Sequence, residues 1–390
     1  MKEQLFIVFA VIGGAAVIPF FARKFRIPSA ALEIIYGIVL FNTILAARPD
    51  WFLLMKELGL IFLMFIAGME LDIQKFVTEK RFHWYIIIPM LSLFITPFIF
   101  YKLGYPYYLG IAVSVISAGI IIPVLKESEM IDSDFGRDII GIALTGELLS
   151  IIVLMGIDVH HRYGFTVRAG WEGAKLVVLT ALAALCLRIL YIIAWWNPEK
   201  VERVMESDDP VEEGIRAVIF IAFAGALIAY SSGLEPILGS FLAGLVFSYV
   251  FKSKGRFEDK INAVGFGFFI PFFFIGVGAD FDIALLKSIS NIHLSLFLTL
   301  MVLGSNIFPL LLSHFMDTKP LNAAGMSLIL SAPLSMMVVA GTLGMQMELI
   351  NEAMRDSIIL TAIISSILFP FFFRVVVKKI TKEAHPEEAQ

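Results

Sequence analysis

Long apolar runs recur from one end of the chain to the other, and they constrain the fold more than any other feature. A helix needs about 20 mostly apolar residues to cross a bilayer, because every backbone amide must find its partner inside the segment. Cutting the 390 residues at their charge clusters leaves thirteen runs of about this length. The sequence therefore predicts an all-α membrane protein with about 13 transmembrane helices. The predicted spans are 4–22, 29–46, 51–71, 83–101, 106–126, 136–158, 172–195, 214–231, 234–251, 262–279, 288–313, 320–346 and 355–376.

The composition supports this class and argues against others. Hydrophobic residues make up 59% of the chain and charged residues only 16%, which is typical of proteins that live in lipid. The formal net charge of −4 comes without a basic tract, so we expect the bilayer as a partner and no nucleic acid. The sequence shows no phosphate-binding loop, nucleophile triad or metal-ligand cluster. We therefore expect neither an enzyme nor a cofactor.

Lysine and arginine are distributed unevenly between the two sides of the predicted spans. They accumulate in the connections that follow odd-numbered spans and in the C-terminal tail. Basic residues of short loops concentrate on the cytoplasmic side of a membrane. The pattern predicts a multi-pass protein of the cell (inner) membrane, with its N-terminus outside and its C-terminus in the cytoplasm.

The chain also contains an internal repeat. The segments "FLMFIAGMELDI" (62–73) and "FFFIGVGADFDI" (272–283) align without gaps, and "EIIYGIVLF" with "SFLAGLVFS" and "VISAGIIIPVL" with "ILSAPLSMMVV" follow the same order. The offset equals seven spans, an odd number, so the two copies would face opposite sides of the membrane. Inverted-topology repeats of this kind are typical of secondary transporters, whose substrates bind near the midplane.

Two predicted spans carry residues that interrupt helices near mid-membrane. The fifth span contains Gly119 and Pro123, and its repeat mate, the twelfth, contains Pro333. Proline lacks an amide proton and clashes with the preceding turn. We therefore predict two discontinuous, crossing helices whose half-helix ends and freed carbonyls face an ion. The alternative is that these prolines only kink their helices, as is common in membranes.

One carboxylate interrupts the run "IALTGELLSIIVLMGID" (142–158), and it is Glu147. A charged carboxylate at the bilayer centre costs about 2.5–3.5 kcal/mol on insertion scales, so such a group faces the bundle interior and marks a proton or ion path. A buried carboxyl can hold either a proton or a cation, and competition between the two is the simplest antiport mechanism. The alternative is a protonated Glu147 that donates a hydrogen bond and only stabilises helix packing.

Several segments resemble one family of membrane proteins. They are "ELGLIFLMFIAGMELDIQKF" (57–76), "GSFLAGLVFS" (239–248), "PFFFIGVGADFDIALL" (271–286) and "VLKESEMIDSDFGRDIIGIALTGE" (124–147). On these segments the chain is similar to the monovalent cation:proton antiporter superfamily, in the branch with bacterial sodium/proton antiporters and potassium-efflux systems. The interval from Gly136-Arg137 places Glu147 on that family's ion-binding aspartate.

The resemblance also implies that residues 1–390 form a single transmembrane antiporter-like domain with two functional parts. A dimerising scaffold would comprise about 1–71 and 214–279, and a mobile core about 83–158 and 288–376. The segment 172–195 would be a linking helix. We expect a homodimer and no soluble regulatory domain.

The chain departs from the family pattern near the key acid. Relatives have Asp, Asn or Gln before that acid, where this chain has Gly146, and electrogenic relatives carry a lysine where Asn306 falls. A single carboxyl implies electroneutral, one-for-one exchange. The candidate ion- or proton-binding residues are Glu147, Thr145, Ser117 and Asn306.

The function expected from these features is exchange of a monovalent cation, sodium or potassium, for protons, as in pH homeostasis. Two other functions stay open from the sequence. One is an ion-coupled carrier of an organic solute on the same fold. The other is a transport-inactive membrane sensor or scaffold.

Overall fold

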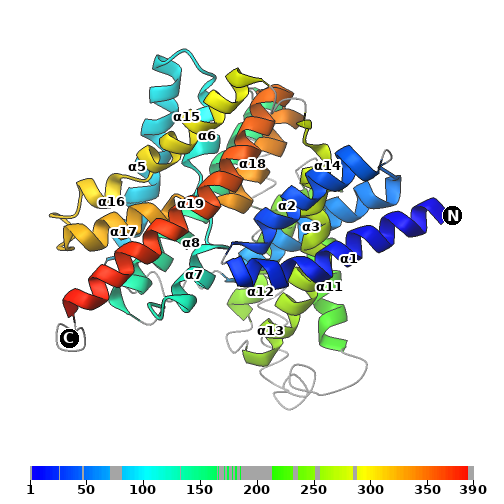
Figure 1. Cartoon of the computed structure of the whole chain (residues 1–390), viewed down its shortest axis with the longest axis horizontal. Helices are drawn as coiled ribbons and strands as arrows, with labels where there is room; N and C mark the ends of the chain where they lie inside the picture. The colour runs from blue at the N-terminus through cyan, green and yellow to red at the C-terminus, as the bar shows by residue number, and fades with distance from the viewer. Residues whose placement is uncertain are drawn as a thin grey trace. The chain divides into compact units, whose positions relative to one another are not determined.

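The computed structural model describes most of the chain as helices joined by short connections (Figure 1). No strand occurs in the described part, in agreement with the predicted all-α class. The described residues are 2–25, 27–45, 48–70, 81–131, 133–164, 213–231, 236–250, 255–283 and 288–384, with a few single positions between 166 and 185.

The chain divides into two compact units. Unit 1 comprises residues 1–25, 32–75 and 155–280, and unit 2 comprises 26–31, 76–154 and 281–390. The predicted scaffold falls mainly in unit 1 and the predicted core mainly in unit 2. Their roles as fixed and moving parts stay predictions.

Unit 1 contains a compact group of apolar helices. Phe52, Phe272 and Ile275 belong to its hydrophobic core and are almost completely buried. The elements of this unit are α1 (Lys2–Phe25), α2 (Ser29–Val39, mostly in this unit), η1 (Leu40–Ile44), α3 (Asp50–Glu70), α11 (Glu213–Ser231), α12 (Pro236–Val250), α13 (Gly255–Val264), η2 (Gly265–Phe269) and α14 (Ile270–Asp280).

Two helix crossings in unit 1 use matched residues of the internal repeat. Where α3 meets α12, a Cβ atom on Gly68 would lie 2.1 Å from the carbonyl oxygen of Phe241. Where α14 meets α2, a Cβ on Gly278 would lie 2.1 Å from the carbonyl oxygen of Ile34. Glycines let helix backbones approach this closely in membranes. The repeated sequence therefore builds the same crossing twice, and Gly244 and Gly37 complete the two crossings from the facing helices.

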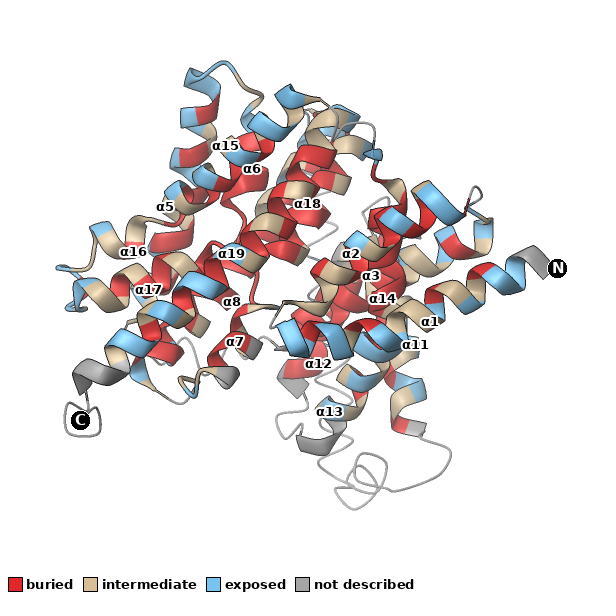
Figure 2. Ribbon diagram, viewed as in Figure 1, coloured by how far each residue is buried: buried red, intermediate tan, exposed pale blue. Residues whose placement is uncertain are grey.

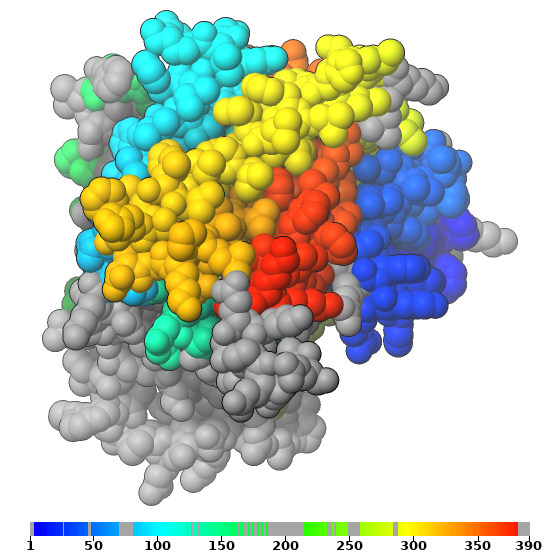
Figure 3. Space-filling view, turned by 60° about the vertical axis from the view of Figure 1, so that its left-hand side comes forward, coloured from blue at the N-terminus to red at the C-terminus, as the bar shows by residue number. Residues whose placement is uncertain are grey.

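Unit 2 is built around two interrupted helices and the long helices that pack on them. Figure 2 shows α18 as almost entirely buried, and Figure 3 shows the α15–α17 region (yellow to orange) beside α19 (red) on one face. The elements are α5 (Phe82–Lys102), α6 (Tyr107–Ser114), α7 (Ile121–Glu127), α8 (Asp134–Tyr163, whose last turns belong to unit 1), α15 (Ile289–Ser305), α16 (Phe308–Leu311), α17 (Pro320–Leu330), α18 (Leu334–Gln346) and α19 (Glu352–Ala384).

Every predicted span except 172–195 coincides with one to three of these helices, and 172–195 lies largely outside the described residues. By length and composition, 8 described helices can cross a membrane, or 9 if the bent pair α17–α18 is one span. Shorter apolar helices at Ser29–Ile44 and Gly239–Ser248 add to these. The chain is thus a multi-pass membrane protein.

Both predicted interruptions exist, but one of the three residues assigned to them is misplaced. Residues 115–120 separate α6 from α7 and include Gly119, and Pro333 lies between α17 and α18, which bend by 44°. Pro123, by contrast, is the third residue of α7 and does not break it. The first turn of a helix tolerates proline, because its amides have no partner within the helix.

Candidate ion-binding site

Glu147 lies on α8 inside unit 2, where it is only 3% exposed. Its Oε1 accepts a hydrogen bond from Ser117 Oγ at 3.0 Å, and its Oε2 accepts one from the Ala118 amide at 3.3 Å. Both donors belong to the non-helical stretch 115–120. A backbone amide can reach a side chain here because the break leaves it without a partner in a helix.

The second interrupted helix reaches the same place. Ser335 is the second residue of α18, and its Oγ lies 2.7 Å from Ser117 Oγ. Ser335 is half-buried and Gly119 beside it is exposed, whereas Ser117 and Glu147 are buried. The two breaks therefore meet at Glu147, and small partly accessible groups lie next to the buried carboxyl.

Gly146 explains how the non-helical stretch comes so close to α8. A Cβ atom on Gly146 would lie 2.8 Å from Ile116 Cδ1 and 2.9 Å from Ile116 Cβ. One turn further, Ser150 Oγ accepts a hydrogen bond from the Ile116 amide at 3.2 Å and donates one to the Gly146 carbonyl at 2.7 Å. The glycine that departs from the family pattern thus provides the space in which residues 116–118 reach Glu147.

The structure brings together some of the predicted site residues and separates others. Ser117 donates a hydrogen bond to Glu147, and Gly119 lies in the same break; their roles in ion binding stay predictions. Thr145 does not share that position, because residues two apart on a helix do not face each other. Asn306 is also elsewhere: its amide nitrogen donates to the Val302 carbonyl at 3.0 Å.

Sequence reasoning overlooked two partners of this site. Ser335 is not among the candidate residues predicted from the sequence, and the Ala118 amide carries no sequence signal of its own. The signal that could have found both is the repeat itself, since it aligns the two broken segments 115–125 and 329–339.

The site differs from the other buried acids of unit 2. Asp138 contacts Arg81 and Asp356 contacts Arg355, so each of these carboxylates has a cationic partner. The partners of Glu147 among the described residues are neutral: two hydrogen-bond donors on one side and hydroxyl oxygens beside them. Such a carboxylate can be neutralised by a proton or by a cation that the nearby oxygens help to hold.

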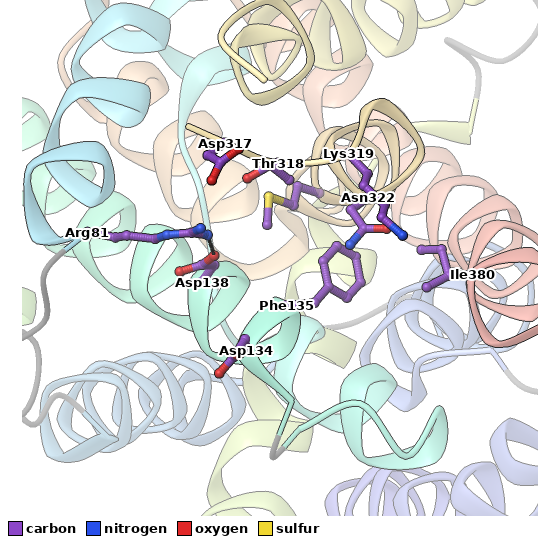
Figure 4. A pocket seen from close by; sticks show the side chains of 10 residues that line it. Arg81, Asp134, Phe135, Asp138, Asp317, Thr318, Lys319, Asn322 and Ile380 are labelled. Atoms are coloured by element: carbon purple, nitrogen blue, oxygen red, sulfur yellow. Dashed lines mark hydrogen bonds and ion pairs between the residues drawn. The ribbon is translucent and has the colours of Figure 1, made fainter. Parts of the chain in front are cut away.

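A separate pocket of about 350 Å³ lies in unit 2 and is lined by both charged and apolar side chains (Figure 4). At its wall, Asp138 accepts hydrogen bonds from Arg81 at 2.5 Å and from the Tyr85 hydroxyl at 2.9 Å. Acidic and basic side chains line it together with the apolar Phe135 and Ile380. The full lining is Arg81, Asp134, Phe135, Asp138, Asp317, Thr318, Lys319, Asn322, Met326 and Ile380.

Comparison with known proteins decides the family. The model of the family described as "Sodium/hydrogen exchanger, transmembrane" matches residues 7–379. The chain belongs to the sodium/hydrogen exchanger family. This agrees with the predicted cation:proton antiporter resemblance, and with the expectation of a transporter rather than an enzyme.

The names of individual relatives agree with this family. The chain is 28% identical to the "Putative Na(+)/H(+) antiporter YjbQ" of Bacillus subtilis (strain 168), over 94% of its own length and 61% of that protein's. It therefore spans less than two thirds of this relative. It is 26% identical to the "High-affinity Na(+)/H(+) antiporter NhaS3" of Synechocystis sp., over 89% of its own length and 76% of the relative's.

The fold has a solved counterpart. The structure of the sodium proton antiporter MjNhaP1 from Methanocaldococcus jannaschii superposes with a TM-score of 0.65, covering 96% of this chain and 99% of that one. Sequence identity in this comparison is 16%, so the likeness concerns the fold alone.

Proposed function

We propose that this exchanger family member moves sodium ions across the membrane in exchange for protons, and that both ions compete for Glu147. The observation that carries the proposal is the meeting of two helix breaks at one buried carboxyl with neutral partners. The relatives compared above are named as sodium/proton antiporters, which favours sodium over potassium as the cation.

The geometry suggests how the exchange works. When Glu147 is ionised, the Ser117 hydroxyl and the Ala118 amide stabilise the carboxylate by hydrogen bonds. A sodium ion that reaches it loses water and needs replacement oxygens, which the carboxylate and the hydroxyls of Ser117 and Ser335 can supply. A proton that reaches it neutralises the same charge without further ligands.

One carboxyl binds one proton or one sodium ion at a time, which supports electroneutral, one-for-one exchange. A neutral carboxyl or a carboxylate paired with sodium costs less to carry through the membrane interior than a bare carboxylate. Alternating access would then occur only in the two loaded states. We place the moving part in unit 2 and the scaffold, with a dimer contact, in unit 1.

The function is tested in liposomes that contain the purified protein and a pH-sensitive dye, with a pH gradient imposed across the membrane. We expect proton movement on addition of sodium and less on addition of potassium. Proton movement that depends on an organic solute, or silence with every cation, would contradict the proposal. Liposomes without protein provide the baseline.

The first quantitative prediction concerns Ser117→Ala. Loss of the hydroxyl removes a hydrogen bond to the carboxylate and one oxygen for the cation, and a hydrogen bond to a charged group contributes about 1.5–3 kcal/mol. We expect the sodium concentration for half-maximal flux to rise about tenfold or more. Ser365→Ala is the matched control, because Ser365 is equally buried and donates only to the carbonyl of Ala362 in its own helix. Equal effects of the two changes would show that Ser117 is not part of the ion-binding site.

A second prediction follows from competition for one carboxyl. At acidic pH protons displace sodium from Glu147, so sodium flux falls on the acidic side of the pH profile. When a saturating sodium concentration is raised tenfold, the pH of half-maximal sodium flux on the acidic side should fall by about one unit, since one proton exchanges for one ion. Radioactive sodium uptake at a series of pH values measures the shift. If this pH is the same at all sodium concentrations, the two ions bind at separate groups.

A further inference from the structure

A second cluster of buried polar groups lies in unit 2, at the C-terminal end of α15. Asn306 follows the last residue of that helix and is completely buried. Its amide nitrogen donates to the Val302 carbonyl at 3.0 Å and to Ser305 Oγ at 3.2 Å. Ser305 Oγ donates in turn to the carbonyls of Val302 at 2.8 Å and Val113 at 3.3 Å, and Ser92 Oγ donates to the Ser305 carbonyl.

The cluster continues onto α17. Ser331 Oγ donates to the Ser327 carbonyl at 2.7 Å and lies 3.4 Å from the Val302 carbonyl, which Asn306 also contacts. Ser327 lies one turn before Ser331 on the same face of its helix. The cluster thus joins the ends of α6, α15 and α17 through side chains that carry no charge.

Two buried oxygen atoms on the residues of this cluster have no hydrogen-bond partner among the described residues. They are Asn306 Oδ1 and Ser327 Oγ, in side chains that are 0% and 3% exposed. The orientation of the Asn306 amide is fixed by its neighbours, because its nitrogen must donate to the Val302 carbonyl. A buried acceptor without a donor is destabilising, because it has lost its hydrogen bonds to water. Asn306 Oδ1 is therefore an atom that a ligand with positive charge would satisfy.

The helix ends around it point to the same kind of ligand. The carbonyls of Val113, Val302 and Ser327 belong to the last turns of α6, α15 and α17, which end at Ser114, Ser305 and Leu330. The last turn of a helix carries the negative end of its dipole. Each of these three carbonyls accepts a hydrogen bond from a side chain of the cluster. The Asn306 amide and the hydroxyls of Ser92, Ser305 and Ser331 donate to other oxygens of the cluster, so none of these protons is directed at Asn306 Oδ1.

We propose that Asn306 Oδ1 and the surrounding hydroxyl and carbonyl oxygens bind a monovalent alkali cation, at a neutral site separate from Glu147. The proposal rests on the proposed function, because the ion would be of the same kind as the one exchanged at Glu147. Binding here needs no titratable group, so it is independent of pH in the range where Glu147 exchanges its proton. The site would hold a cation on unit 2 without competing with protons.

The test measures binding rather than transport. The full-length protein with Glu147→Gln, which removes the carboxylate site, is purified in detergent and unfolded by heat in sodium chloride or in choline chloride of equal ionic strength. We expect sodium to raise the apparent Tm by about 2–4 °C at saturation. The rise should disappear when Asn306→Leu is added, and it should be unchanged by Ser366→Ala, a buried serine that donates within its own helix.

Two outcomes would overturn the site. One is no sodium-dependent rise with Glu147→Gln. The other is a rise that survives Asn306→Leu because that change destabilises the protein by the same amount in both salts, as expected if the cluster holds only water. If Asn306→Leu does not fold, Ser327→Ala takes its place, with a reduced rise expected. Absence of sodium-driven proton movement by the wild type would instead contradict the proposed function, and the two failures are therefore distinguishable.

Discussion

Liposomes that contain the Glu147→Gln protein are expected to show no more sodium-dependent proton movement than liposomes without protein. Glutamine has the size of glutamate and can still accept a hydrogen bond from Ser117. It can neither bind a proton in the working pH range nor neutralise a sodium ion. Its amide nitrogen would also face the Ala118 amide, which donates to Oε2 in the native protein. Transport should be lost while the fold is retained.

The matched control is Glu57→Gln, which removes an exposed carboxylate from α3 in unit 1. This protein should transport sodium like the wild type. Size-exclusion profiles of both variants establish that neither is misfolded. Residual exchange by Glu147→Gln above the protein-free level, with unchanged dependence on sodium, would show that another group carries the ions.

The second large effect is expected from Gly278→Ala, a change of one methyl group far along the chain from Glu147. The new Cβ would lie 2.1 Å from the Ile34 carbonyl oxygen, 2.8 Å from the Ile38 nitrogen and 2.9 Å from Gly37 Cα. All three neighbours are backbone atoms, so no side chain can move aside and α14 must shift away from α2. Overpacking costs about 1–3 kcal/mol and sometimes more, and a clash between backbones belongs at the upper end.

The measurements are the yield of monodisperse protein and its apparent Tm in detergent, both of which should fall sharply. Gly13→Ala serves as the control, because its Cβ would meet no atom within 4 Å and alanine favours a helix over glycine. Gly68→Ala, at the equivalent crossing of α3 and α12, should behave like Gly278→Ala. A stable Gly278→Ala protein would mean that these two helices are not held at backbone contact.

The positions of the spans could be predicted from the sequence because lipid leaves the backbone little choice. Each run must pair its own amides, so it forms a helix wherever it is long and apolar enough. The interruption at Pro333 was equally accessible, since proline cannot continue the hydrogen-bond pattern. The burial of Glu147 followed from the cost of exposing a carboxylate to hydrocarbon.

The surroundings of Glu147 depend on how separate segments pack, and a local pattern does not contain that information. Thr145 is close in sequence but lies on another face of α8, and Asn306 belongs to a different cluster at the end of α15. Ser335, almost 190 residues away, reaches the site because both helix breaks meet there. Gly146, a departure from the family pattern, lets the first break approach α8. Sequence alone therefore determined the helices and the buried acid. Tertiary packing decided which oxygen and amide groups surround that acid, because the position of a non-helical segment depends on the elements that pack against it.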